Sequence, residues 1–376
     1  MMKVAIVSIT RTHLLNLAIA LDKKEDTDVT FYTLTPTKRL RSFGYDGKVV
    51  NFAFPLGIIF FIIHKLPLSY KNGQRAGHKL RKWFDKFCSW AIKPCDVLIG
   101  ENGDAYYTTL VAKKKFNPIA ICDQGSEHIL TQDESFRNLG LFINPWNTTN
   151  LLNHYSVCDY IMTPSEYVKT TDIEHGISLD KILYNPYGVD PELFQPTQKP
   201  KKDAYDVIMV GNWCLRKSCD LLSQSILESG LSLLHVGAVT NCPFPVSDKC
   251  TDIGLVQERE LPIYYAQAKV FILPSRNEGF GLVLSQAVAC GLPIVYSTGT
   301  GGPEINRLMG GKSACFEIAN PISAETISAA LKKAIEYANN LPGGIRQPYG
   351  DEFQNVTWAA YGERYHKILI DIINRR

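Results

Sequence analysis

The sequence lacks several patterns that would place it in a common class. Its ten cysteines show no paired C-x-x-C spacing, and Cys214 and Cys219 are the closest pair. This argues against a zinc site or a disulfide framework and favours reduced, buried thiols. The most apolar run, residues 52–63, is too short to span a bilayer as a helix. The opening MMKVAIVSIT is too strand-like for a signal peptide, so we expect a cytoplasmic protein.

A strong excess of one charge is also missing. The 376 residues include 40 Lys or Arg and 37 Asp or Glu, a formal net charge of +3. Nucleic-acid-binding domains are usually strongly basic, so we do not expect nucleic acid as the main partner. No G-x-G-x-x-G follows the first strand pattern, which counts against a dinucleotide-dependent dehydrogenase. Length and a 45% apolar composition are typical of a globular protein of about two domains.

Short β-branched runs alternate with longer amphipathic segments along most of the chain. Strand patterns occur in two series, at residues 3–9, 29–34, 95–100, 118–123 and 159–165, and then at 205–211, 231–237, 269–275 and 293–298. Helical patterns lie between them, for example at 165–176, 218–230 and 261–268. Such alternation is typical of parallel sheets covered by helices on both faces. The two series predict an α/β protein with two Rossmann-like domains whose strand carboxyl ends face an interdomain cleft.

The stretch from Pro191 to Asp206 separates the two series. It holds three prolines and three lysines with little periodicity, which is typical of a linker. We therefore expect a first domain at residues 1–196 and a second at 197–355. A last helix pattern at 356–376 has apolar residues along one face, and we expect it to pack back on the first domain. These apolar positions are Trp358, Tyr361, Tyr365, Ile368 and Ile372.

The stretch SRNEGFGLVLSQAVACGLPIV, from Ser275 to Val295, joins a strand pattern to a helix pattern. The helix is predicted over residues 282–289, because Gly291 and Pro293 follow in the order that ends a helix.

The residues around this helix start suit an anionic ligand. Gly279 and Gly281 leave the backbone bare, so an anion can meet free N–H groups with help from the helix dipole. Glu278 can accept hydrogen bonds from hydroxyl groups, and Gln286 carries a carbonyl further along the helix. A sugar joined through a diphosphate to a ribose would fit the separation between Glu278 and Gln286. The alternative is that Glu278 is a simple helix cap and Gln286 a surface residue.

This stretch resembles the E-x7-E signature of family 4 retaining glycosyltransferases, which have the GT-B fold. Other segments resemble the family in the right order: 164–196, which ends in G-V-D-x-x-x-F-x-P; 210–222, similar to the phosphate-binding strand, loop and helix; 252–275, similar to the nucleobase region; and 298–305, similar to G-G-x-P-E. The resemblance covers residues 162–305 well and the first 150 residues only loosely.

The resemblance implies a nucleotide-sugar donor site in the second domain. Glu278 would hold hydroxyls of the donor sugar, and Lys217 would neutralise the leaving diphosphate, with Arg216 as the second cation. The remaining donor-binding residues implied are Gly211, Asn212, Val256, Gly279, Phe280, Gly281, Leu282 and Gln286. Two positions depart from the family: Gln286 replaces its second glutamate, and Asn212 stands where it has an arginine. The change to Gln286 would weaken ribose binding without abolishing the reaction.

The first domain would then bind the acceptor. The family often places a histidine near the end of the strand at 118–123, which makes His128 a fourth catalytic candidate; a capping or packing histidine is the alternative. Asp123 and Ser126 lie in the same segment. The family's Gly-Gly loop after the first strand is replaced by SITRTHLLN, so Arg11 is expected on the acceptor side, together with Asp104 after another strand.

The function implied is retaining transfer of a sugar from a UDP- or GDP-linked donor to a glycan or lipid-linked glycan, as in cell-surface polysaccharide synthesis. Cations and helix termini can neutralise the diphosphate, so we expect neither a metal nor a cofactor. A non-catalytic nucleotide- or glycan-binding relative is the alternative, because of Gln286 and Asn212.

Residues 52–93 form a basic, apolar segment. Lys65 to Lys93 carries eight Lys or Arg and one Asp, and Leu80, Trp83, Phe84, Phe87 and Ala91 fall on one helical face. A basic amphipathic helix of this kind can lie on an anionic membrane surface, here the inner face of the membrane. The alternative is a helix that packs on the core of the first domain with a solvated basic side.

Overall fold

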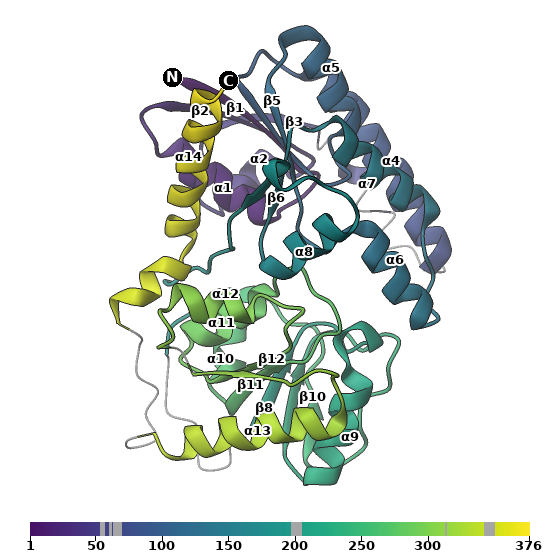
Figure 1. The fold of residues 1–376 in the computed structure, drawn as a ribbon, viewed down its shortest axis with the longest axis vertical. Coiled ribbons are helices and arrows are strands. Elements are labelled where there is room, and N and C mark those ends of the chain that lie inside the picture. The colour runs from purple at the N-terminus through teal and green to yellow at the C-terminus, as the bar shows by residue number, and fades with distance from the viewer. Residues whose placement is uncertain (53–56, 60–61, 63–69, 197–204, 313, 342–349) are drawn as a thin grey trace. The chain divides into compact units, whose positions relative to one another are not determined.

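The computed structural model describes residues 1–376 except 53–56, 60–61, 63–69, 197–204, 313 and 342–349 (Figure 1). The chain divides into two compact units. Unit 1 comprises Met1–Pro164, Lys169–Asn185 and Tyr361–Arg376, and unit 2 comprises Ser165–Val168 and Pro186–Ala360. The middle of the predicted linker, and with it the start of the predicted second domain at 197, lies outside the described residues.

Unit 1 is built on a parallel sheet of seven strands in the order β3-β2-β1-β4-β5-β6-β7. The strands are β1 (Met2–Val7), β2 (Thr27–Thr33), β3 (Lys48–Asn51), β4 (Val97–Glu101), β5 (Ile119–Asp123), β6 (Tyr160–Thr163) and β7 (Ile182–Tyr184). The α-helices are α1 (His13–Asp22), α2 (Thr37–Arg41), α4 (Tyr70–Ala91), α5 (Tyr106–Phe116), α6 (Ile129–Asn138), α7 (Pro145–Val157), α8 (Glu166–Glu174) and α14 (Trp358–Asn374). The first three residues of α8 and of α14 belong to unit 2.

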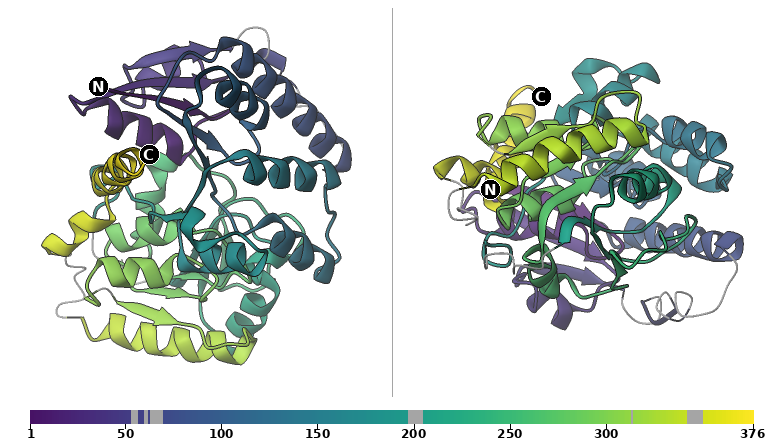
Figure 2. Two further views of the ribbon diagram at one scale, coloured as in Figure 1. Left: turned by 45° about the horizontal axis from the view of Figure 1, so that its top comes forward. Right: turned by 90° about the horizontal axis from the view of Figure 1, so that it is seen from below.

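Unit 2 has a parallel sheet of six strands in the order β10-β9-β8-β11-β12-β13 (Figures 1 and 2). The strands are β8 (Tyr205–Val210), β9 (Leu233–Val236), β10 (Cys250–Asp252), β11 (Ala268–Leu273), β12 (Ile294–Tyr296) and β13 (Cys315–Glu317). Its α-helices are α9 (Cys219–Ser229), α10 (Leu261–Tyr265), α11 (Leu282–Ala289), α12 (Gly302–Leu308) and α13 (Ala324–Asn339).

All nine predicted strands are present, and the described part of the chain holds four further strands that the sequence patterns missed. The missed strands are β3, β7, β10 and β13, and each is an edge strand of its sheet. They are three or four residues long and contain no buried residue. Central strands such as β5 and β9 are buried throughout and therefore read as apolar runs. The apolar run that predicts a strand thus reflects burial of that strand in the sheet. An edge strand can form without such burial, so it can lack the apolar run.

The C-terminal helix α14 packs on unit 1, as predicted. Tyr361, Tyr365, Leu369 and Ile372 are buried, and a Cβ on Gly362 would lie 2.3 Å from Ala20 of α1. Leu369, rather than the predicted Ile368, occupies the core position.

Helix α4 packs against the core of its own unit, unit 1. Leu80 and Phe84 are buried in its core, with Phe87 and Ala91 packed against the same cluster, whereas Trp83 is 59% exposed. The apolar face that we predicted for a membrane surface therefore lies against the protein, and most of residues 52–69 lies outside the described part of the chain.

Candidate functional site

The glycine-flanked loop after β11 has the predicted form. Helix α11 begins at Leu282 and ends at Ala289. Its N-cap, Gly281, has φ +80°, and a Cβ there would lie 2.6 Å from Leu273 Cδ2. Only glycine fits this backbone without strain. The sharp turn places the acidic residue Glu278 immediately before the helix start.

Two cations converge on the Glu278 carboxylate. Oε2 of Glu278 lies 3.1 Å from a guanidinium nitrogen of Arg216 and 3.3 Å from Nζ of Lys217. Burial raises the pKa of Glu278, but the charges of Lys217 and Arg216 lower it by more, so the pKa lies below its usual value. Glu278 is therefore ionised at neutral pH. Three of the four predicted catalytic residues thus come together within unit 2.

A second ion pair fixes the two cations relative to the acidic loop. Arg216 and Lys217 lie on a 3-10 turn, η3 (Leu215–Lys217), just before α9. Arg276 binds Asp220 of α9 through two N–H···O bonds of 2.8 Å, and its backbone N–H donates to the Arg216 carbonyl at 2.9 Å. Bidentate pairs of this kind restrict geometry as well as adding energy. No motif in the sequence marks this pair, because its two residues lie 56 positions apart.

Gly211, at the end of β8, is closely surrounded. Its φ is +119°, and a Cβ there would lie 3.0 Å from Lys217 Nζ. Its carbonyl accepts a hydrogen bond of 2.8 Å from Nε2 of the fully buried His235. Nδ1 of His235 lies 2.7 Å from a carboxylate oxygen of Asp252. The glycine therefore leaves room for the lysine ammonium, while His235 holds the peptide from the other side.

Sequence reasoning missed His235 and Asp252. His235 lies inside a strand pattern, and the sequence does not distinguish a histidine with a specific role there from one that is simply buried. Asp252 lies in the edge strand β10, which was not predicted.

The other predicted donor-side residues make contacts of their own. Gln286 Oε1 accepts a hydrogen bond of 3.1 Å from the Tyr265 hydroxyl. Phe280 is buried against the ring of Tyr187. Asn212 is exposed, while Leu282 and Val256 are half-buried. The Gly279 carbonyl accepts from the Ser165 hydroxyl at 2.7 Å.

In unit 1, the predicted acceptor-side residue Asp123 is buried at the end of β5. It lies 2.6 Å from Nε2 of His13 and accepts from the Tyr365 hydroxyl of α14 at 3.0 Å. Burial lowers the pKa of His13, but the charges of Asp123 and Glu101 raise it by more, so the net shift is upward. Arg11 lies over the ring of Phe43, 4.2 Å from its centroid, and Ser126 is half-buried.

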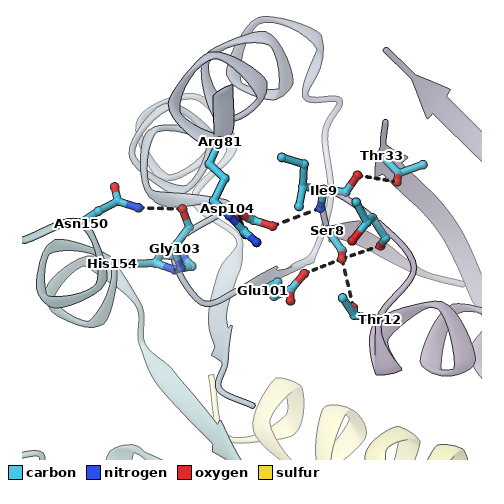
Figure 3. A network of polar contacts seen from close by, with 11 residues as sticks. Ser8, Ile9, Thr12, Thr33, Arg81, Glu101, Gly103, Asp104, Asn150 and His154 are labelled. Atoms are coloured by element: carbon cyan, nitrogen blue, oxygen red, sulfur yellow. Dashed lines mark hydrogen bonds and ion pairs between the residues drawn. The ribbon is translucent and has the colours of Figure 1, made fainter. Parts of the chain in front are cut away.

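Asp104 belongs to a polar network beside the end of β4 (Figure 3). It is fully buried, and its carboxylate binds Arg81 and the backbone N–H of Ile9. Glu101 accepts a hydrogen bond of 2.6 Å from the Ser8 hydroxyl. Burial, followed by the Asp104 charge, raises the pKa of Glu101 to about 7.

His128 has the capping position that we gave as the alternative. It is the N-cap of α6, and its Nδ1 accepts from the Leu130 backbone N–H at 3.3 Å. Its ring stacks on Tyr155 and His175. Burial, with a smaller effect from His175, lowers the pKa of His128 to about 4. The capping interpretation is confirmed, and a contact with donor or acceptor stays a prediction.

Three general features concern the described residues. All ten cysteines are free. No group of three or more His, Cys, Asp or Glu side chains there could hold a metal ion. Asp26 and Asp28 form an Asp-x-Asp pair, but their carboxylates bind His366 and Lys48. Within the same part of the chain, no helix is long and apolar enough to cross a bilayer.

In a comparison with known sequences, part of unit 2 matches a protein family. Residues 244–341 match the family model described as glycosyl transferases group 1. The chain is 28% identical over 178 residues to "Uncharacterized 41.2 kDa protein in cps region" of Klebsiella pneumoniae, covering 44% of this chain and 50% of the relative. It is 36% identical over 84 residues to O-antigen chain mannosyltransferase B of Escherichia coli, covering 22% and 20%. The matches span half or less of these relatives.

Comparison with solved structures extends over the whole chain. Sucrose-phosphate synthase from Thermosynechococcus elongatus superposes with a TM-score of 0.68 at 16% identity, covering 100% of both chains. Anabaena HepE in complex with UDP-glucose superposes with a TM-score of 0.66 at 13% identity, covering 99% of this chain and 100% of that one. The fold is therefore the predicted GT-B fold. Together with the match on unit 2, it supports placing the chain among the glycosyltransferases.

Proposed function

We propose that this protein is a retaining, metal-independent glycosyltransferase that takes its sugar from a nucleoside-diphosphate sugar. The observation that carries the proposal is the group formed by Glu278, Arg216 and Lys217 beside the glycine-flanked start of α11. Two cations and a helix N-terminus suit a diphosphate, and an ionised carboxylate suits sugar hydroxyls.

Each residue of the group would have a defined task. The bond from the anomeric carbon to the diphosphate oxygen breaks while the acceptor hydroxyl oxygen forms a bond to the same carbon from the same face. The leaving diphosphate takes the hydroxyl proton, and negative charge grows on it as it leaves. Lys217 and Arg216 would stabilise this charge, which is strongest in the transition state. Glu278 would accept hydrogen bonds from the sugar and keep both cations in place beforehand. His235 would act at one remove, by holding the Gly211 peptide beside Lys217.

The acceptor is proposed to be a glycan or a lipid-linked glycan of a cell-surface polysaccharide, bound by unit 1 on the cytoplasmic side of the membrane. The names of two relatives, an O-antigen chain mannosyltransferase and a protein of a cps region, support this direction. The candidate acceptor-side residues are Arg11, Asp104, Asp123 and Ser126.

A panel of UDP- and GDP-sugars tests the donor chemistry. The protein should release nucleoside diphosphate slowly from at least one of them, with EDTA present. Glu278→Gln and Lys217→Met should each reduce the release by about 10²–10³-fold, the usual cost of removing one transition-state contact. Glu325→Gln, an exposed carboxylate on α13, is the matched control and should leave the rate unchanged. The product's anomeric configuration, read by NMR, tests retention.

A non-catalytic binding relative is the second candidate. It is favoured by the engagement of the Gln286 carbonyl with Tyr265 and by the uncharged Asn212 that follows Gly211 in the chain. UDP or GDP would then raise the unfolding temperature without any turnover of a sugar nucleotide. If neither nucleotide binds, the glycosyltransferase and the nucleotide-binding relative are both wrong, and only a glycan-binding relative is left.

A further inference from the structure

Charge is distributed unevenly among the helices of unit 1. Helices α4, α5 and α7 form one layer, in which α5 contacts both of the others (Figure 1). These three helices contain nine Lys or Arg residues and a single acidic residue, Asp85. Since the chain has 40 basic and 37 acidic residues, the remainder has 31 and 36. One helical layer therefore carries a formal charge of +8 on a chain whose other residues sum to −5.

The outer side of α4 alternates basic and aromatic residues. At 100° per residue, its exposed Lys, Arg and Trp side chains fall within an arc of about 100°. These are Arg75, Lys79, Lys82, Trp83, Lys86 and Trp90, which we call the α4 stripe. Trp83 is 59% and Trp90 is 73% exposed. Single exposed apolar side chains are common on protein surfaces, but large ones grouped on one side of a helix are typical of an interaction site.

Neighbouring helices extend the α4 stripe with the same chemistry. Lys82 and Lys86 lie over the ring of Tyr107 of α5. Arg75 lies over the ring of Trp146 of α7, 5.1 Å from its centroid. Trp146 is 43% exposed. Basic and aromatic groups thus cover all three helices rather than one turn of α4.

Asp85 and Arg81, the other charged residues of α4 whose side chains are described, do not neutralise this surface. Asp85 is buried, where it accepts hydrogen bonds from the backbone N–H groups of Tyr107 and Thr108. Arg81 binds the buried Asp104. The inner side of α4 serves the core of unit 1. The ring of Trp90 contacts Phe87, which packs against that core, but most of Trp90 stays exposed, so core packing does not account for the two exposed tryptophans.

We propose that the α4 stripe and its extension onto Tyr107 and Trp146 dock unit 1 on an anionic lipid bilayer. Tryptophan prefers the interface between water and acyl chains, and lysine can keep its ammonium among the headgroups while its stem covers apolar surface. Each basic residue near an anionic surface adds to the attraction. A polyanion such as nucleic acid would use the positive charge but not two tryptophans aligned on one side of a helix. The proposal concerns unit 1 alone and does not depend on the donor chemistry of unit 2.

Vesicle sedimentation tests this surface. The full-length protein is mixed with vesicles of phosphatidylglycerol and phosphatidylcholine, and with vesicles of phosphatidylcholine alone. We expect binding to the anionic vesicles that weakens with added salt, and little binding to the neutral ones. Lys79→Glu combined with Lys82→Glu should weaken binding at least about tenfold, since each basic residue contributes roughly a factor of five. Trp83→Ala should weaken it at least about threefold.

A matched charge reversal in unit 2 is the control. Lys332→Glu combined with Lys333→Glu changes two exposed lysines of α13 by the same amount and should leave vesicle binding unchanged. All variants should keep the wild-type unfolding temperature, because none of the four lysines is buried and Trp83 is largely exposed. Absence of wild-type binding overturns the proposal, as does an equal loss in the control. Full binding by Trp83→Ala, or displacement from vesicles by DNA of equal charge, would instead identify a polyanion site.

Discussion

Single residues decide how the cations of unit 2 are held. Lys217 is mostly buried, yet its ammonium lies beside both the Glu278 carboxylate and the bare backbone of Gly211. A buried ammonium is costly without a partner, so Glu278 stabilises it. Because the pKa of Glu278 is lowered in the folded state, this stabilisation is present at neutral pH and is lost as the pH falls through that lowered pKa.

Gly211→Ala tests the space around Lys217. The new Cβ would lie 3.0 Å from Nζ, on a backbone with φ +119°. We expect a loss of about 1–3 kcal/mol in the free energy of unfolding, measured in urea, together with weaker UDP or GDP binding in calorimetry. Gly310→Ala, with φ +61° and open space around its Cβ, is the control for a positive-φ substitution away from Lys217. Nucleotide affinity that falls equally in both variants would show that the contact with Lys217 is unimportant.

His128 gives a prediction for pH. Its pKa is about 4 in the folded protein and near 6.5 in the unfolded chain. Between these values the unfolded chain binds the extra proton, so stability falls as the pH drops from about 6.5 to 4. The full pKa difference corresponds to about 3 kcal/mol, and solvent screening should reduce the loss to about 2 kcal/mol. His128→Asn keeps a residue that caps helices but does not titrate. Its free energy of unfolding should vary less over this range, and an unchanged slope would mean that another group is responsible.

Among the elements, the C-terminal helix is the clearest case of remote packing. Helix α14 follows unit 2 in sequence but buries its side chains in unit 1. Its Tyr365 also donates a hydrogen bond to Asp123, 242 residues earlier. The helix therefore completes the core around a predicted acceptor-side carboxylate.

Leu369→Ala measures the contribution of α14. The side chain is fully buried, and its truncation should reduce the free energy of unfolding by about 2–5 kcal/mol. Lys367→Ala, an exposed position on the same helix, should change it by less than about 0.5 kcal/mol. Urea titrations monitored by circular dichroism make the comparison. Equal effects in the two variants would mean that α14 does not pack on unit 1 in solution.

At the scale of the whole molecule, each of the two units has its own sheet and its own buried core. We therefore expect the two units to unfold in separate transitions. The cations and the glycine-flanked helix start that we propose for the donor all belong to unit 2.

Scanning calorimetry with a saturating nucleotide tests this division. UDP or GDP at about 100 times its dissociation constant should stabilise the unit that binds it by about 2.7 kcal/mol. If two transitions are resolved, only one should move, and Lys217→Met should abolish the shift. A single transition that shifts as a whole would indicate that the units unfold together.

The sequence alone predicted most of the fold because both sheets are parallel and covered on two faces. Their central strands must be apolar, and the four edge strands were missed because they need not be. The start of α11 was also predictable, since Gly281 and Glu278 are neighbours in the chain and the turn is a local property.

Only the tertiary structure decided the contacts between residues far apart in sequence. His235 reaches Gly211 across 24 residues, and Arg276 reaches Asp220 across 56. It also decided which side of α4 faces outward. The sequence showed that the helix has aromatic and basic residues, but only the structure shows that Leu80 and Phe84 are buried in the core of unit 1 and that Trp83 is exposed. Periodicity shows that a helix has an apolar side, but only the packed sheet selects which of its large side chains are buried.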